Sequence, residues 1–449
     1  MSNNNKADMT VGRISPQLIR FAIPLILGNF FQLTYNAADS IIVGRFVGPN
    51  ALAAVGAASP IMNIIIFMIV GICLGMSVLM SEFYGAGNMG KLKREIATSL
   101  IAGGIFTLAV IILGIIFSRS ILKFMSTPDE IIDDATHFLQ IIFIGLIFTF
   151  TYNIYASTLR SMGNSKVPLY FLITSSIMNV IMDLLFVIVF KMGVIGAACA
   201  TVTAEAISAV LCIIYVWKKI PSLKFKRKEF VFDRLLLRDT VNYSSVSAMQ
   251  QICLYIGKLF VQGAVNPLGV HAIAAFNAVN RIDDFVLAPE QSIAHSATTF
   301  LAINRGAGQT QRMRKGFTSS FKIELVYSIV LMIGIYFGAY WLIYPFVGDE
   351  GANVIESGIS YLKTMAFFYF LPGITNIFQG FFRGIGKLKI TLNSTFFQIT
   401  ARAIAAYILA PHWGLTGVAY ACLFGWIVML AYEVPCFWKA WRKKAKPTV

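Results

Sequence analysis

The chain has 449 residues, of which 57% are hydrophobic and only 13% are charged, about half the charged share that is usual in soluble proteins. These proportions exclude disordered, collagen-like and coiled-coil proteins, and they leave too little polar surface for a soluble protein of this length. The net charge is nevertheless +16, which in a soluble protein would favour nucleic-acid binding, so the position of the charges along the chain decides what they mean.

Long uncharged segments recur along the chain and predict membrane-spanning helices. The core of a bilayer is about 30 Å thick, and a helix of about 20 apolar residues crosses it. A membrane barrel would instead alternate polar and apolar residues, which these segments do not. We therefore predict an all-α integral membrane protein with about twelve transmembrane helices. In chain order the expected helices are residues 17–43, 52–81, 96–118, 135–159, 168–190, 195–217, 240–263, 272–301, 317–344, 359–382, 391–410 and 415–438.

The distribution of basic residues predicts the orientation of the chain in the membrane. With an even number of helices both termini lie on one side, and the termini and connections of that side hold 28 of the 37 Lys and Arg residues. By the positive-inside rule this side faces the cytoplasm. We thus expect a multi-pass protein of the bacterial plasma membrane with both termini in the cytoplasm. The net charge then reflects topology, and no nucleic-acid partner is expected.

Short motifs of the first half recur in the second half, in the same order and at a nearly constant spacing. The paired motifs begin at Ala51 and Ala272, at Gly85 and Gly306, at Arg160 and Arg383, and at Gly193 and Gly414. We therefore predict an N-terminal six-helix lobe over residues 1–217, a basic cytoplasmic linker over 218–238, and a C-terminal six-helix lobe over 239–449. Because six is even, the lobes are parallel repeats, which is typical of transporters with a site between two halves. A channel or an inert scaffold is the alternative.

Several motifs together resemble the multidrug and toxic compound extrusion (MATE) family of transporters, and they cover essentially the whole chain in the family's order. They are Pro24 followed by Asp39-x-x-x-x-Gly44-Arg45-x-x-Gly48, the loop Arg160-x-x-Gly163-Asn164-x-Lys166-x-Pro168, Asn179-x-x-x-Asp183 ahead of Gly193-x-x-Gly196, and Asn304-x-Gly306-Ala-Gly308. The resemblance implies two helix bundles around a V-shaped central cavity. It also implies secondary active efflux of small organic compounds by alternating access, coupled to H⁺ or Na⁺.

Acidic side chains inside the predicted helices are the first candidates for function, because an ionisable group at membrane depth is costly. Asp39 has Tyr35, and Asp183 has Asn179, four residues earlier and so on the same helix face. Two interpretations of this group stay open. Asp39, Asp183 and Asn179 hold Na⁺ through their oxygens, or the aspartates carry a proton, because burial favours the neutral form of a carboxylic acid.

The resemblance places these residues together in a cavity of the N-terminal lobe and adds Asn153 and Thr201 to them. It further implies that the arriving ion neutralises Asp39 and Asp183, and that the first helix then bends at Pro24 and releases the substrate outward. The alternative is that each aspartate only stabilises a broken helix.

The second half lacks counterparts of these acids, which disfavours a cation site there. Arg402 and Ala406 stand where the repeat would place the asparagine and the second aspartate. Lys258 either pairs with a neighbouring acid (Glu290, Asp283 or Asp284) or joins Arg402 in accepting an anionic or zwitterionic substrate. The polar candidates for the substrate cavity are Lys258, Glu290, His295, Arg402 and, in the first half, Glu205.

No motif of an enzyme or a primary pump occurs in the sequence. GxSxG, HExxH and P-loop motifs are absent, and the histidines and cysteines show no metal-binding spacing. We therefore predict no enzymatic activity and no cofactor beyond the coupling ion. We further expect a monomer in the lipid bilayer, with an amphipathic organic cation as its small-molecule substrate. The alternative functions are a flippase for lipid-linked precursors or polysaccharides of the same superfamily and, less favoured, an integral-membrane enzyme.

Overall fold

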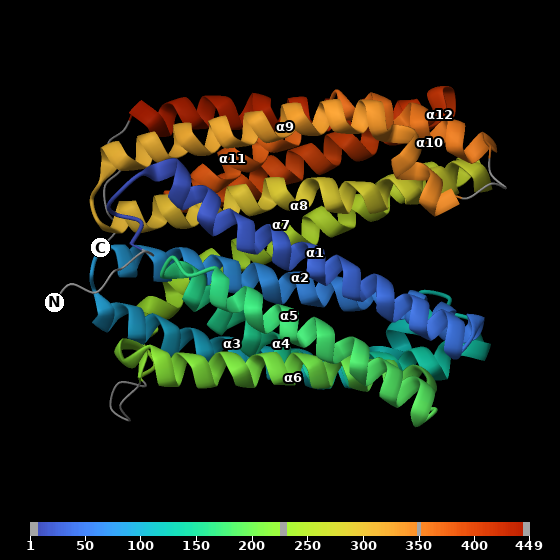
Figure 1. Cartoon of the computed structure of the whole chain (residues 1–449), viewed down its shortest axis with the longest axis horizontal. Helices are drawn as coiled ribbons and strands as arrows, with labels where there is room; N and C mark the ends of the chain where they lie inside the picture. Colours follow the sequence, from blue (N-terminus) through green and yellow to red (C-terminus); the bar gives the residue numbers. More distant parts are fainter. Residues whose placement is uncertain (1–7, 225–230, 348–351, 443–449) are drawn as a thin grey trace. The chain divides into compact units, whose positions relative to one another are not determined.

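The computed structural model describes residues 8–224, 231–347 and 352–442, and within these ranges the chain is helical with short connections and no β-strand (Figure 1). The prediction of an all-α fold is therefore confirmed for these residues. The helices are α1 (Ile14–Phe46), α2 (Pro49–Gly85), α3 (Met89–Phe124), α4 (Asp129–Ser161), α5 (Lys166–Asp183), the π-helix η1 (Leu184–Val189), α6 (Gly193–Lys219), the short η2 (Pro221–Leu223), α7 (Arg234–Val265), the short η3 (Asn266–Leu268), α8 (Val270–Gly306), α9 (Thr310–Val347), α10 (Ala352–Ala366), α11 (Phe370–Gly384) and α12 (Leu388–Arg442).

All twelve predicted segments fall on these helices to within one residue. The segment 168–190 covers most of α5 and all of η1, and the segment 359–382 covers parts of both α10 and α11. In the described ranges, eight helices are long and apolar enough to cross a membrane, and the pair α10–α11, bent by 48°, makes nine when it is counted as one span. The helices α7 and α8 do not meet that criterion. In α8 the reason is visible in the sequence, because Arg281, Asp283, Asp284 and Glu290 interrupt its apolar residues.

Two of the predicted helices, 391–410 and 415–438, belong to the single long element α12, whose helical geometry is broken at Gly414. This residue has a φ of 56°, which a side chain would make costly. Gly193, its counterpart in the first half of the repeat, has a φ of 60° at the start of α6. A glycine with a positive φ thus occurs at the same place in both halves of the chain.

The contacts within the chain define two compact units. The N-terminal unit is Leu27–Ala248, and the C-terminal unit is Met1–Ile26 together with Met249–Val449. Helices α1 and α7 therefore contribute residues to both units. The predicted lobes, 1–217 and 239–449, follow the internal repeat rather than these contacts and stay a prediction, and part of the predicted linker, residues 225–230, lies outside the described residues.

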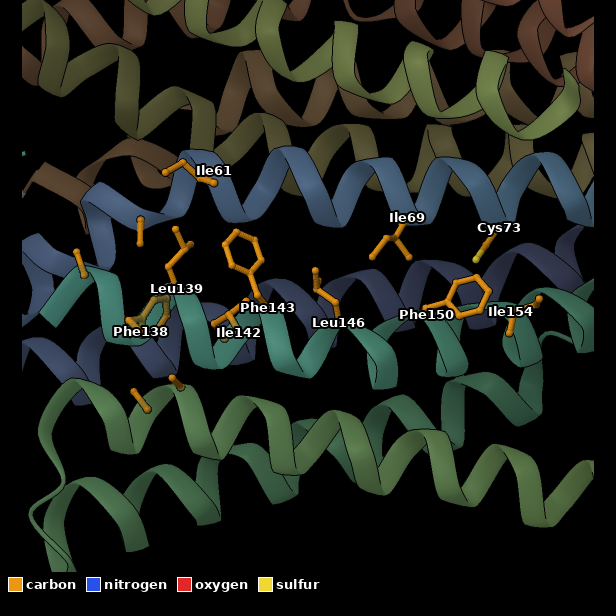
Figure 2. Close-up of a cluster of buried hydrophobic side chains, with 14 of the residues drawn as sticks. Ile61, Ile69, Cys73, Phe138, Leu139, Ile142, Phe143, Leu146, Phe150 and Ile154 are labelled. Atoms are coloured by element: carbon orange, nitrogen blue, oxygen red, sulfur yellow. The ribbon is translucent and has the colours of Figure 1, made fainter. Parts of the chain in front are cut away.

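The core of the N-terminal unit lies between α2 and α4, and α4 also packs against α3 and α6. Figure 2 shows Ile61, Ile69 and Cys73 of α2 facing a row of apolar side chains along α4. Phe143 and Phe150 of this row are almost completely buried, at 1% and 3% exposure. The row is Phe138, Leu139, Ile142, Phe143, Leu146, Phe150 and Ile154.

Helices α2 and α7 approach each other closely within the N-terminal unit because glycines of α2 lie at the contact. A Cβ atom at Gly71 would lie 2.6 Å from the Cα of Ala248, and one at Gly75 would lie 2.6 Å from the Cα of Ser244. These distances are shorter than any normal Cβ contact, so a residue with a side chain requires the two backbones to separate.

The C-terminal unit has a core formed by α8 with α9, α10, α11 and α12. Near the start of α9, Phe317 stacks against Phe437 of α12 with ring centroids 4.7 Å apart. The beginning of the chain also belongs to this unit. Ser296 of α8 donates a hydrogen bond of 2.9 Å to the carbonyl oxygen of Leu18, and Arg312 of α9 donates one of 2.9 Å to that of Met9.

Candidate functional site

Helix α5 brings two of the predicted site residues into the interior of the N-terminal unit. Asn179 and Asp183 are 2% and 0% exposed, and they lie one turn apart on the same helix face. Both carboxylate oxygens of Asp183 and both polar atoms of the Asn179 amide lack a hydrogen-bond partner. Asp183 is the last residue of α5, and the π-helix η1 begins directly after it. Single π-helical turns of this kind are frequent at functional sites.

Helix α1 places the second aspartate against the first. The carboxyl groups of Asp39 and Asp183 lie within hydrogen-bonding reach of each other, and Oδ1 of Asp39 has no donor. The two helices pack where α1 has Gly28, because a Cβ there would lie only 3.2 Å from Cδ2 of Leu172 in α5. Two carboxylates within hydrogen-bonding reach of each other repel unless a proton or a cation lies between them. The pair therefore has the chemistry of a proton or cation site.

Helices α4 and α6 add a third acid near this pair. The hydroxyl group of Thr149 donates a hydrogen bond to the carboxylate of Glu205. Glu205 and Asp39 are both near enough to interact electrostatically with the half-buried Tyr35. The structure thus brings Tyr35 and Glu205 into one polar region with the aspartate pair. The sequence did not single out Thr149, because only the packing of α4 against α6 joins its side chain to Glu205.

The remaining predicted site residues of the N-terminal unit bond to their own helices. The Asn153 amide donates to the carbonyl oxygen of Thr149 over 2.8 Å, and the Thr201 hydroxyl donates to that of Ala197 over 3.1 Å. Their part in ion binding stays a prediction. Pro24 lies within the continuous helix α1. The part of α1 up to Ile26 belongs to the C-terminal unit, so Pro24 lies two residues before the point where α1 passes into the N-terminal unit.

Of the candidates in the C-terminal unit, Lys258 is paired with an acid. Its Nζ lies 2.9 Å from Oδ1 of Asp284, and the lysine side chain is 62% exposed. Arg402 of α12 lies near Asp283, Tyr361 and Cys422 instead. Lys258 and Arg402 therefore each face a different acidic residue of α8.

Glu290 and His295 follow Pro289 on α8 but differ in burial. Glu290 is 0% exposed and neither of its carboxylate oxygens has a hydrogen-bond partner, whereas His295 is half-buried. Beside Glu290 lies Glu324 of α9, which the sequence did not single out. It lies inside the predicted helix 317–344, and no local spacing in the sequence links it to Glu290 of another helix.

A family model, MatE, matches residues 24–185 of the chain and again residues 247–408, together more than two thirds of its length. The chain belongs to the MatE family. The two matches begin at Pro24 and Ser247, and this spacing agrees with that of the repeated motifs Arg160 and Arg383. As a member of the MatE family the protein is a multi-pass membrane transporter rather than an enzyme.

Curated relatives and solved structures resemble this MatE protein along almost its entire length. Probable multidrug resistance protein YpnP of Bacillus subtilis is 28% identical over 383 residues, or 85% of each chain. Probable multidrug resistance protein YoeA of the same organism is 28% identical over 436 residues, or 94% of this chain and 93% of the relative. A MOP superfamily transporter from Pyrococcus furiosus has a similar structure, with a TM-score of 0.89 and 23% identity over 99% of this chain and 100% of that one. The last likeness concerns the fold alone.

Proposed function

We propose that this MatE protein is a cation-coupled efflux transporter that exports small organic compounds across the plasma membrane by alternating access. The observation that carries the proposal is the pair of Asp39 and Asp183, whose carboxyl groups lie side by side and three of whose four oxygens are buried without a donor. The family and the names of the multidrug resistance relatives support export as the direction of transport.

The pair couples ion binding to conformation through the cost of burying charge. Without an ion, two neighbouring carboxylates repel each other and favour separation of α1 from α5. A bound proton or Na⁺ removes this repulsion and lets the acids stay buried. We propose that this loss of repulsion makes α1 bend at Pro24. A proline inside a helix leaves one backbone hydrogen bond unmade, which makes bending easier at that position.

The substrate that suits this polar region is an amphipathic organic cation. Three of the region's acidic side chains, Asp39, Asp183 and Glu205, are candidates to attract a positive group, and no lysine or arginine was found to bond them among the described residues. The coupling ion competes for the same charge. Binding of the ion would therefore release the substrate.

Transport in proteoliposomes tests this function and identifies the coupling ion. The purified chain is reconstituted, and ethidium movement is followed while a pH gradient and a Na⁺ gradient are imposed separately. We expect one of the two gradients to drive ethidium uphill against the direction of ion flow, and protein-free vesicles provide the control. Transport that responds to neither gradient would contradict the proposal.

A further inference from the structure

A second pair of buried acids lies in the C-terminal unit, whereas the aspartate pair belongs to the N-terminal unit. Glu290 of α8 and Glu324 of α9 are 0% and 2% exposed. All four of their carboxylate oxygens lack a hydrogen-bond partner. A buried charge without a donor or a counter-ion is among the least stable arrangements in a protein.

The groups around this pair do not neutralise it. The groups that act on Glu290 are the acids Glu324 and Asp283 and the amide of Asn376 in α11, which lies within hydrogen-bonding reach but carries no charge. Tyr327 of α9 lies beside both glutamates, but its hydroxyl group donates to the carbonyl oxygen of Val286 over 3.0 Å.

Two basic residues of the same unit interact with other acids of α8. Lys258 pairs with Asp284, and Arg402 acts on Asp283. Two carboxylates in a region of low polarity, with a third acid behind them, cannot both be charged, so at least one must carry a proton.

The pair also lies where three helices meet and where small changes in spacing have an effect. Pro289 directly precedes Glu290 and removes a backbone hydrogen bond from α8. On the other side Gly373 of α11 makes room for α9, because a Cβ there would lie 2.9 Å from Oε1 of Glu324 and 2.7 Å from Oγ of Ser328. Loss of the proton would place two like charges between α8 and α9 and force them apart at this point.

We propose that Glu290 and Glu324 form a proton-binding site in the C-terminal unit, separate from the aspartate pair, whose occupancy changes the packing of α8, α9 and α11. The proton is held between the two carboxyl groups and exchanges with solvent when these helices separate. Proton binding at this pair does not depend on what Asp39 and Asp183 bind. Its contribution to transport does rest on the proposed function.

Infrared spectroscopy of the full chain in lipid nanodiscs tests the site, because a protonated carboxyl group has its own carbonyl band. Spectra of the native chain and of the double variant E290Q/E324Q are compared over a series of pH values, in H₂O and in D₂O. We expect the native chain to show, at neutral pH, a band of at least one carboxyl group that the double variant lacks and that shifts in D₂O. The D39N/D183N variant should keep it. Glutamine has nearly the size of glutamic acid and mimics its neutral form, so the fold should survive.

Two further variants make the outcome decisive. Glu95→Gln removes a buried acid that accepts hydrogen bonds from Thr240 and Ser99, and it should leave the band of the pair unchanged. Gly373→Ala keeps both glutamates but crowds Glu324, and it should alter the band without removing it. Identical spectra of the native chain and E290Q/E324Q at every pH would overturn the proposal, as would a band that Na⁺ abolishes at constant pH.

Transport assays then separate this site from the proposed function. If both are correct, E290Q/E324Q should lower the number of protons exchanged per ethidium exported. Normal coupling in D39N/D183N would instead contradict the proposed function and leave the infrared result unaffected.

Discussion

At Asp183 the α-helical backbone ends and a π-helix begins, so the most buried acid of the N-terminal unit's aspartate pair lies at a change of helix type. The i, i+4 spacing of Asn179 and Asp183 predicted that they share a face, because this relation is local to one helix. The proximity of Asp39 was implied only by the family resemblance. Glu324 was missed altogether, because its partner Glu290 comes from another helix and no local spacing links the two.

Lys258 allows a direct prediction at the scale of a single residue. Its ion pair with Asp284 is largely exposed, and pairs of this kind contribute about 0–1 kcal/mol to stability. We expect Lys258→Gln to lower the thermal stability only slightly and to leave ethidium transport nearly unchanged. The comparison is with Asp284→Asn, which removes the other half of the same pair. A selective loss of anionic substrates in Lys258→Gln would show instead that the lysine contacts substrate.

Among the helices, the sequence predicted best those that consist of one long apolar segment. The segments over α2, α3 and α4 were found because about 20 apolar residues suffice to cross a bilayer. The six-residue π-helix η1 was not predicted, because its sequence Leu-Leu-Phe-Val-Ile-Val is as apolar as the α-helix that it continues. The sequence also did not predict which helices pack together. Nothing in the sequence distinguishes the glycines of α2 that contact α7 from other glycines in apolar helices.

The contact of α2 with α7 gives a prediction for packing. Gly75→Val should force the two backbones apart and lower the stability by about 1–3 kcal/mol or more. The control is Gly104→Ala in α3, where an added Cβ meets nothing within 4 Å. Thermal unfolding of both variants, followed by size-exclusion chromatography of the detergent-solubilised protein, measures the difference. Equal stability of Gly75→Val and the native chain would contradict the close approach of α2 and α7.

For the whole molecule, three observations support the repeat. The motifs recur at a nearly constant spacing, the family model matches the chain twice at a similar spacing, and Gly193 and Gly414 share a positive φ. Orientation rests on charge alone. Of 37 basic residues, 28 belong to the termini and to connections on one predicted side of the membrane.

Reporter fusions test that orientation. A fluorescent protein fused after Val449 should fluoresce in the cytoplasm, and alkaline phosphatase fused at the same place should be inactive. Alkaline phosphatase inserted between α3 and α4, next to the exposed Asp129, should be active and serves as the opposite control. The reverse result at both places would invert the proposed topology.

The most direct test of coupling is gradient-driven efflux by the variants Asp39→Asn and Asp183→Asn in proteoliposomes. Asparagine keeps the size of the side chain but can neither ionise nor carry a proton, so each variant should lower uphill ethidium transport by about tenfold or more. Asp129→Asn, which removes an exposed acid far along the chain, should transport like the native protein. Uphill transport by Asp39→Asn or Asp183→Asn at the native rate, under the same gradient, would contradict coupling through this pair.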